Sequence, residues 1–434
     1  MNKKIGLLTT FYNLDPGYSL VTVVMQQLAM LHSQGYDPVL FGLTNFTPEA
    51  EEQLPEWVEL RKVIPQWLLE PYGQTGAPVP ADFEGNVSAT VKVYEESFKD
   101  LDALIAHDIC FINSYLIYNV ALKKANLNNL PIFQQIHSGP SARQNHPYPW
   151  DELWKLPANT KIIYMNYSEK TAAAEMYGVW DKDVKVVFNP MDLRAMFKLS
   201  PLTCNLIDEY KLFEADIIAV YPLSTTRMGD DGKAVRKVIA IMGFLKQLGQ
   251  NVRLVIPNAH ANGANEKNAI QLMLQIGQRY GLTSQELIFT SLFDVPNNEH
   301  GVPHQTVVEL FQIANLFVFP SYSENAPLIL LEAAATKNLM VLNEDFAPMK
   351  DFVGPEGAYY FRFKSRLINE TIYRGDRGED GYFNDIALIV LDNLRNDKAM
   401  SGFTTIRKKF NIDWIAKNQL IPAIEEAIGG RTRV

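Results

Sequence analysis

The stretch Ser321-Tyr-Ser-Glu324-Asn-Ala-Pro327-Leu-Ile-Leu-Leu-Glu332-Ala-Ala-Ala decides how the rest of this chain is interpreted. An apolar run at residues 314–320 comes directly before it and is typical of a buried strand. A short polar loop that contains Glu324 follows the run. Proline is favoured in the first turn of a helix, so Pro327 predicts that a helix begins there. We call residues 321–335 the organising stretch. Together with the run before it, this stretch predicts a strand, a loop and a helix in direct succession.

Two carboxylates frame this predicted loop and helix. Glu332 lies eight residues after Glu324, inside a segment in which Leu328, Leu331 and Ala335 keep helical spacing. One carboxylate is thus expected at the end of a strand and the other about two turns into the helix. The free backbone N–H groups at the start of a helix favour an anion, so the spacing indicates an anion site between the two glutamates.

This stretch resembles the E-x7-E element of retaining glycosyltransferases of the GT-B fold, in particular the large family-4 group. The resemblance implies that Glu324 contacts the sugar of a nucleotide-sugar donor and that Glu332 binds the ribose hydroxyls. It also implies that the backbone of Asn325, Ala326 and Pro327 faces the sugar and the diphosphate. Two glutamates at this spacing are also common as surface carboxylates, which is the alternative.

The composition suits a globular enzyme. A length of 434 residues suggests two or three domains, and 47% hydrophobic with 21% charged residues is ordinary. The net charge of −9 gives no support to a broad surface for nucleic acid or anionic membrane. Cys110 and Cys204 provide no disulfide framework and no zinc quartet. The start turns polar by Thr9, too soon for a signal peptide, and no apolar run is long enough for a membrane span, so we expect a cytoplasmic protein.

The beginning of the chain is organised as strand, loop, helix and strand. Residues 4–10 form the first apolar run, residues 11–19 form the loop, and Ser19 is a plausible helix N-cap. This is the opening of a nucleotide-binding α/β domain. The resemblance puts the loop at the floor of a cleft between two domains, with Gly17 close to the donor. Many family members have a Gly-Gly pair there, whereas this chain has Gly17 alone.

Two later strands of the same domain are expected to end in histidine. His107 follows the apolar residues 101–106 and is itself followed by Asp108, and His137 ends the run 131–136. Ligands in such sheets bind at the carboxyl ends of strands. The resemblance places His107 near the reacting sugar, while a structural role for a histidine at the end of a strand remains the alternative.

The loop at residues 140–150 contains Arg143, His146, Tyr148 and Trp150. Aromatic side chains beside a cation suit a pocket for an acceptor, and we name His137, Arg143 and Trp150 as candidates on that side. A packed proline-rich loop is the alternative.

A second domain is expected to begin near Cys204. Its first strand, residues 217–222, is followed by a loop that contains Arg227 and Lys233. This pair matches the family's Arg and Lys, which clamp the donor diphosphate, and two cations can offset the charge on a leaving nucleoside diphosphate. The family has Gly after this Lys, and this chain has Ala234. A solvated basic pair in a turn is the alternative.

The resemblance also assigns the base of the nucleotide to the backbone just after the strand at residues 286–290, that is, near Leu292 and Phe293. No metal is expected. The D-x-D sequence of Asp181 and Asp183, a metal motif of another glycosyltransferase fold, lies in a predicted turn with no supporting ligands.

Together these features predict an α/β protein of the GT-B fold, with two Rossmann-like domains whose parallel sheets face each other across a cleft. The expected domains are residues 1–200, with a C-terminal helix at 406–434 that packs back on them, and residues 204–405. The predicted function is metal-independent, retaining transfer of a sugar from a nucleotide sugar, with UDP as the expected nucleotide, to a hydroxyl acceptor. Glycan, lipid-linked sugar, small molecule, protein and modified nucleic acid all remain open as acceptors. The rival functions are a sugar-nucleotide epimerase on the same fold and a non-catalytic two-domain protein that binds a small ligand.

Overall fold

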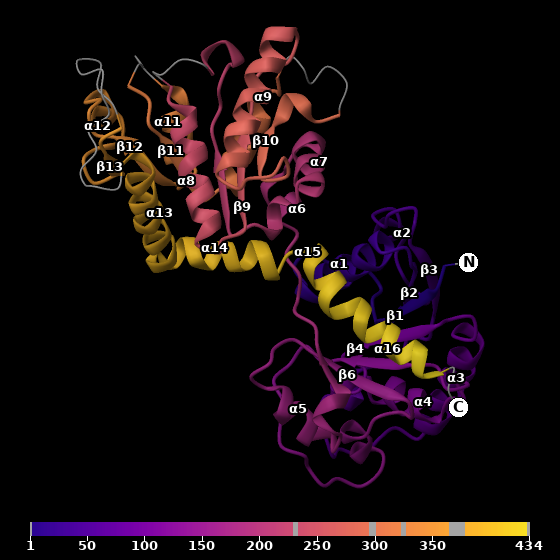
Figure 1. Ribbon diagram of the computed structural model, residues 1–434. Helices are drawn as coiled ribbons and strands as arrows, with labels where there is room; N and C mark the ends of the chain where they lie inside the picture. The colour runs from indigo at the N-terminus through magenta and orange to yellow at the C-terminus, as the bar shows by residue number, and fades with distance from the viewer. Residues whose placement is uncertain (1, 229–232, 295–300, 323–326, 364–377, 432–434) are drawn as a thin grey trace. The chain divides into compact units, whose positions relative to one another are not determined.

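The computed structural model describes residues 2–228, 233–294, 301–322, 327–363 and 378–431. It divides the chain into two units (Figure 1). The first unit contains Met1–Met191 and Phe410–Val434, and the second contains Asp192–Lys409. Sequence analysis placed the same divisions at residues 200, 204 and 406. No helix in the described parts is both long enough and apolar enough to cross a bilayer.

The first unit is built on a seven-stranded sheet in the order β3-β2-β1-β4-β5-β6-β7. Every pairing in this sheet is parallel. The strands are β1 Lys4–Leu8, β2 Asp37–Leu43, β3 Glu59–Ile64, β4 Ala103–His107, β5 Ile132–Gln135, β6 Thr160–Tyr164 and β7 Val184–Val186. The helices are α1 Ser19–Ser33, α2 Pro48–Glu51, α3 Phe83–Ser97, α4 Leu116–Lys124, α5 Lys170–Tyr177, α15 Ile412–Ile415, the π-helical turn Ala416–Leu420 and α16 Ile421–Arg431.

Both faces of this sheet are covered, which explains why its strands are almost continuously apolar. One buried cluster joins the sheet to α3 and α4. The other cluster joins the sheet to α1 and to the C-terminal segment, where Ile415, Leu420 and Ile424 pack with Val24 and Leu28. The segment that completes the first unit is therefore far from it in sequence (α16 in Figure 1).

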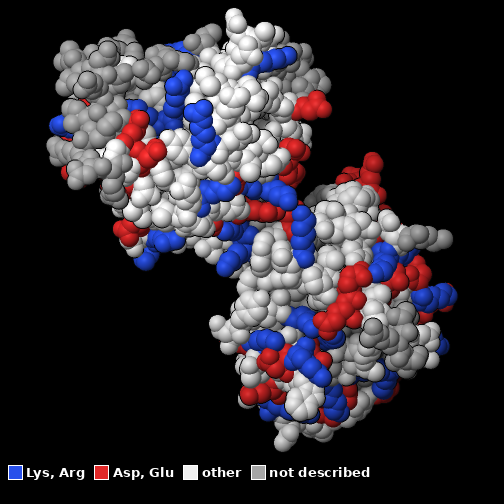
Figure 2. All heavy atoms as spheres, viewed as in Figure 1, with Lys and Arg blue, Asp and Glu red and all other residues white. Residues whose placement is uncertain are grey.

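Ion pairs also hold α16 on the first unit. Glu426 pairs with both Lys161 and Lys185, and Glu425 pairs with Lys3. On the face seen in Figure 2, charges of both signs are interspersed over this unit. A face on which both signs are interspersed does not produce the single-sign field that attracts a polyanion.

The second unit is built on a six-stranded parallel sheet in the order β10-β9-β8-β11-β12-β13. Its strands are β8 Ile217–Val220, β9 Val252–Ile256, β10 Leu287–Phe289, β11 Leu316–Phe319, β12 Leu339–Asn343 and β13 Tyr359–Phe361. Its helices are α6 Leu193–Phe197, α7 Pro201–Glu209, α8 Val235–Gln247, α9 Ala264–Arg279, α10 His304–Ile313, α11 Leu328–Ala335, α12 Pro348–Val353, α13 Gly378–Asn396 and α14 Lys398–Lys409.

The two sheets confirm the predicted fold class of two Rossmann-like α/β domains. One detail differs from the prediction. The helix expected from Ile406 onward is interrupted, because α14 ends at Lys409 within the second unit and a new helix begins after Asn411. The Asn411 side chain accepts a hydrogen bond from the Trp414 N–H, as an N-cap does. The return to the first unit therefore starts at Phe410.

Candidate functional site

The second unit holds a buried cation at the carboxyl edge of its sheet. Lys233 lies between β8 and α8 and is 8% exposed. Its Nζ atom lies 5.7 Å from the centroid of the Phe319 ring, at the end of β11. The Lys233 carbonyl accepts a hydrogen bond from the Tyr221 hydroxyl at 2.5 Å. These contacts fix an ammonium group beside the strand that leads into the organising stretch.

Backbone geometry just after Lys233 is unusual. Ala234 precedes α8 with φ of 51° and ψ of 34°, which is the left-handed region. That region favours glycine because a Cβ crowds the backbone there. The position at which the sequence departs from the family's Gly is therefore a position where the backbone conformation is the one glycine adopts most easily.

Arg227 ends a short 3₁₀ turn, Thr225–Arg227, in the loop after β8. Its side chain is half-buried. The Thr225 hydroxyl donates to the carbonyl of His260, so the loop after β8 is tied to the loop after β9. Arg227 and Lys233 thus belong to the same edge of the sheet, and residues 229–232 between them are outside the described part.

The organising stretch is only partly described. Glu324, Asn325 and Ala326 lie outside the described residues, so their predicted roles are untested. Pro327 is buried and immediately precedes α11, which begins at Leu328 as the sequence predicts. The side chains of α11 that face the core are those of Leu330 and Ala333.

The helical repeat noted in the sequence lies on the exposed face of α11. Leu328 and Leu331 are 68% and 42% exposed, so the repeat that contains them marks the outer face of the helix within this unit. The same helix carries Glu332, whose side chain is 18% exposed. Its Oε1 atom lies 2.6 Å from His304 Nε2, and its Oε2 atom is buried with no hydrogen-bond partner among the described residues. A buried carboxylate oxygen without a partner is a place where a ligand hydroxyl can donate.

Two residues predicted at the base of the nucleotide follow β10. Leu292 is 49% exposed, and the half-buried ring of Phe293 lies 6.0 Å from the ring of Tyr210. Nearby, the buried Ser291 hydroxyl has no hydrogen-bond partner within the described part of the chain. Their role in binding a base remains a prediction.

The first unit places His107 and His137 side by side, as two adjacent strand ends require. His107 Nδ1 lies 3.1 Å from His137 Nε2, and the rings are nearly parallel with centroids 5.4 Å apart. Burial lowers the pKa of His107 well below its usual value, with a further contribution from His137. Burial also lowers the pKa of His137 to about 4. Both imidazoles are therefore neutral at physiological pH, and one proton is shared across the 3.1 Å contact.

The neighbouring carboxyl group, Asp108, is also perturbed. Asp108 is 4% exposed and has a positive φ of 57°, which is rare outside glycine and is often found at functional sites. Burial raises the pKa of Asp108 to about 6, although the backbone N–H of His137 donates to its Oδ1 atom at 2.9 Å. The buried Nε2 atom of His107 has no hydrogen-bond partner among the described residues. The end of β4 therefore holds an unpaired imidazole nitrogen beside a carboxyl group that is easily protonated.

The other residues predicted for a site in the first unit do not contact His107, Asp108 or His137 in the described structure. Trp150 is 2% exposed and its indole N–H donates to the carbonyl of Ala77 at 2.7 Å, which are the contacts of a core side chain. Arg143 is exposed, and its Nη1 atom lies near Gly178. Gly17 is exposed, has no positive φ, and donates its N–H to Asp15 Oδ1 at 2.8 Å within a turn. Asp181 pairs with Lys170 at 2.7 Å.

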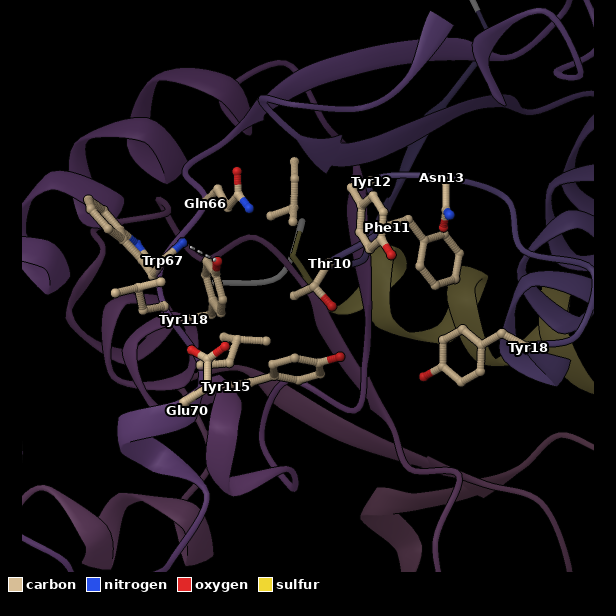
Figure 3. Close-up of a pocket in the computed structure, with 13 residues that line it drawn as sticks. Thr10, Phe11, Tyr12, Asn13, Tyr18, Gln66, Trp67, Glu70, Tyr115 and Tyr118 are labelled. Carbon is tan, nitrogen blue, oxygen red and sulfur yellow. Dashed lines mark hydrogen bonds between the residues drawn. The ribbon is translucent and has the colours of Figure 1, made fainter. Parts of the chain in front are cut away.

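A pocket of about 330 Å³ opens at the carboxyl edge of the first sheet (Figure 3). Six aromatic residues contribute to it, and we call it the tyrosine pocket. Its lining residues are Thr10, Phe11, Tyr12, Asn13, Tyr18, Leu43, Gln66, Trp67, Leu68, Leu69, Glu70, Tyr115 and Tyr118. Tyr115 of the pocket ends the 3₁₀ turn Asn113–Tyr115, and the backbone N–H of Ile112 before this turn donates to the carbonyl of Asp108 at 3.2 Å, so the pocket adjoins the end of β4.

Sequence reasoning found only the part of this pocket that belongs to the loop at residues 11–19. It missed Trp67, Glu70, Tyr115 and His304. Residues 45–95 show no regular apolar period, so no signal placed Trp67 or Glu70 at an edge. Tyr115 had a weak signal, since it follows the end of β4 by eight residues.

Comparisons with known proteins assign no family to this chain. No family model matches the chain, and no curated protein matches its sequence. A glycosyltransferase from Rickettsia africae is 10% identical, with 98% of each chain covered and a TM-score of 0.35. Sucrose-phosphate synthase from Thermosynechococcus elongatus is 13% identical, with 99% of this chain and 100% of that chain covered and a TM-score of 0.35. HepE of Anabaena, in complex with UDP and glucose, is 14% identical, with 99% of each chain covered and a TM-score of 0.30. At these identities and TM-scores the likenesses carry no argument about activity, and the fold assignment rests on the two sheets themselves.

Proposed function

We propose that this protein is a glycosyltransferase that moves a sugar from a nucleotide sugar, with UDP as the nucleotide, to a hydroxyl acceptor. The observation that supports it most directly is the position of Lys233. Its ammonium group is held beside Phe319 at the end of β11, and the loop that contains it also contains Arg227. A buried cation at the carboxyl edge of a parallel sheet suits the diphosphate of a nucleotide.

In the proposed reaction the second unit binds the donor. Lys233 and Arg227 contact the diphosphate and stabilise the charge that develops on it as the bond from the anomeric carbon to the diphosphate oxygen breaks. Glu332 accepts hydrogen bonds from the ribose through its Oε2 atom, which has no partner in the described part of the structure. Glu324, together with the backbone at Asn325 and Ala326, holds the sugar. In this proposal the second unit thus binds the donor.

The first unit supplies the neighbourhood of the reacting carbon. The acceptor oxygen forms the new bond to the anomeric carbon, and its proton passes to the leaving diphosphate. We propose that this occurs with retention of configuration, as the resemblance to retaining glycosyltransferases implies, with the leaving phosphate and no enzyme carboxylate accepting the proton. We propose that His107, which is neutral and whose Nε2 atom has no hydrogen-bond partner among the described residues, holds a sugar hydroxyl.

No metal is part of the proposed mechanism, because the two cations take the role that a metal ion takes in other phosphate sites. Activity is expected to survive EDTA, and Asp181→Ala is expected to be near neutral. Loss of activity in EDTA that is restored by manganese or magnesium contradicts this part of the proposal.

The experiment that tests the function is a measurement of free UDP released from UDP-sugars with and without pools of acceptors. A glycosyltransferase releases UDP in proportion to the acceptor consumed, and NMR of the product gives the anomer formed. Conversion of the UDP-sugar into its epimer, with no acceptor consumed and no net release of UDP, points to the epimerase alternative. Tight binding of UDP-sugars with no turnover against any pool points to the binding protein. An inverted anomer contradicts retention alone and leaves sugar transfer standing.

A further inference from the structure

The tyrosine pocket combines rigid aromatic walls with polar groups that have no hydrogen-bond partner among the described residues. The indole N–H of Trp67 donates to Thr90 at 3.0 Å, which fixes the ring. The Tyr118 hydroxyl donates to the carbonyl of Pro65 at 2.8 Å and accepts from the backbone N–H of Trp67 at 3.3 Å, so the Tyr118 ring is fixed as well. Walls whose positions are set before a ligand arrives lower the entropy cost of binding.

Unlike the Trp67 and Tyr118 rings, several polar groups of the pocket are not fixed by hydrogen bonds to described residues. No hydrogen bond to another described residue is made by the side chains of Asn13, Gln66 and Glu70 or by the hydroxyls of Tyr12 and Tyr18. Figure 3 shows these groups distributed around the opening. Two amides, a carboxylate and two phenols can both donate to and accept from a ligand that carries several hydroxyl groups.

The charge of the pocket excludes one class of ligand. Among the described residues that line it, Glu70 is the one charged side chain, and none is lysine, arginine or histidine. A phosphate group would lie near that carboxylate without a cation to offset its charge, and recognition of phosphate normally depends on such cations. An uncharged ligand avoids this cost.

Among uncharged ligands, the aromatic walls favour one with a saturated ring. An aromatic face carries partial negative charge and attracts the weakly positive C–H face of a saturated ring. A flat phenolic ligand could also stack on these walls, but it would leave the amides of Asn13 and Gln66 and the carboxylate of Glu70 without partners, which weakens binding. A volume of about 330 Å³ suits one or two rings and lies at the low end of small-molecule sites.

We infer that the tyrosine pocket is the acceptor site and that the acceptor is an uncharged carbohydrate, held by its ring faces and its hydroxyl groups. This rests on the proposed function. It also replaces the acceptor side expected from the loop at residues 140–150, since Trp150 is buried against Ala77. The pocket includes Tyr115, whose turn begins at Ile112 with a hydrogen bond to the carbonyl of Asp108 at the end of β4, and this is where a hydroxyl must arrive if His107 lies near the reacting sugar.

The test is a binding experiment on the full chain without any donor, using saturation-transfer NMR. The probes are maltose, the methyl glycosides of glucose, galactose and mannose, glucose 6-phosphate and p-nitrophenol. At least one neutral glycoside is expected to receive saturation and to bind more tightly than glucose 6-phosphate or p-nitrophenol. Glu70→Gln is expected to weaken it about tenfold, as loss of a charged hydrogen-bond acceptor does. Tyr12→Ala, which removes a ring that is 51% exposed, is expected to weaken it as well.

Both positions lie at the surface, so the variants are expected to fold, and Glu56→Gln, an exposed glutamate away from the pocket, gives the same change of charge as a control. The inference is overturned if no neutral glycoside binds, if binding is unchanged in the Glu70→Gln and Tyr12→Ala variants, or if the phosphate or the phenol is preferred. Calorimetry with UDP is run in parallel. Glycoside binding without UDP binding refutes the proposed function and leaves the pocket's ligand class standing, whereas UDP binding without glycoside binding does the reverse.

Discussion

The carboxyl edges of the two sheets are built on the same scaffold but differ in charge. The edge of the second unit carries Lys233 and Arg227, with Glu332 close to His304. The edge of the first unit has two histidines that burial keeps neutral, and a pocket without a described cation. The comparison teaches that a parallel sheet supplies a place for a ligand, while a few side chains after the strands decide whether that ligand is an anion or a neutral molecule.

The largest expected effect comes from removing the cation of the second edge. Lys233→Met keeps most of the side-chain volume over Phe319 and removes the charge. UDP affinity is expected to fall by roughly 30- to 100-fold, since a charge-assisted contact to phosphate is lost. Calorimetry with UDP measures the loss, and Lys267→Met, on the exposed face of α9, is the matched control. Binding of neutral glycosides is expected to stay unchanged. Equal UDP affinity in both variants would mean that the two edges do not differ as proposed.

The next effect concerns the stability of the first edge. The folded-state pKa of Asp108 is raised from 3.8 to about 6, because burial favours the protonated carboxyl group. Its contribution to the free energy of unfolding is therefore complete below about pH 4 and is lost as the pH rises through about 6. Asp108→Asn keeps a side-chain oxygen that accepts from the backbone N–H of His137, and the amide cannot ionise. At neutral pH this variant is expected to be more stable than the parent, by up to about 3 kcal/mol.

The measurement is the difference in Tm between Asp108→Asn and the parent across the range from about pH 4 to pH 8. The difference is expected to shrink as the pH falls and to vanish near the ordinary pKa of aspartate. His137 has a pKa lowered to about 4, so protonation of this histidine costs stability in acid in both proteins and cancels in the difference. A difference that is independent of pH contradicts the raised pKa of Asp108.

A smaller effect separates the two roles within the second edge. Glu332→Gln removes the charge from a carboxylate whose Oε2 atom is buried without a described partner. UDP affinity is expected to fall by the equivalent of roughly 1–3 kcal/mol, with kcat changed less than affinity. Glu356→Gln, an exposed change in the same unit, is the control. If the variant lowers kcat and spares UDP affinity, Glu332 acts on the transition state and the ribose assignment is wrong.

The smallest effect is a gain at the same edge. Ala234→Gly relieves the positive φ of 51° and adds chain entropy to the unfolded state, and these two terms oppose each other. We expect a net stabilisation of no more than about 1 kcal/mol, seen as a small rise in Tm with unchanged UDP affinity. A fall in Tm would mean that the Cβ of Ala234 contributes packing that outweighs the strain.

The sequence predicted both sheets because continuous apolar runs followed by polar residues describe buried parallel strands well. It also predicted the place of Lys233, since the loop after the first strand of a second Rossmann-like domain must lie at that edge. The proximity of His107 and His137 could be predicted for the same reason, because β4 and β5 are neighbours and a histidine lies at or just after the end of each strand.

The features that escaped prediction depend on contacts between distant segments. Trp150 occurs in a polar, proline-rich loop and was expected to be available to a ligand, but Ala77 and Tyr72 enclose it. Trp67 owes its place in the pocket to Thr90 and Tyr118. Short irregular segments are held by such contacts rather than by a repeat of their own, so period and propensity do not reveal them.

The way in which the first unit is closed has a consequence for biosynthesis. Its core includes Ile415, Leu420 and Ile424, which a ribosome adds only after the whole of Asp192–Lys409. The second unit is continuous in sequence and can be completed as soon as it emerges. Domains usually fold in the order in which they are made, but here the unit that is started first must wait with Val24 and Leu28 uncovered until the other is finished. A nascent chain that stalls within α14 would carry this apolar surface exposed, and a chaperone that recognises such surfaces would bind the early unit rather than the late one.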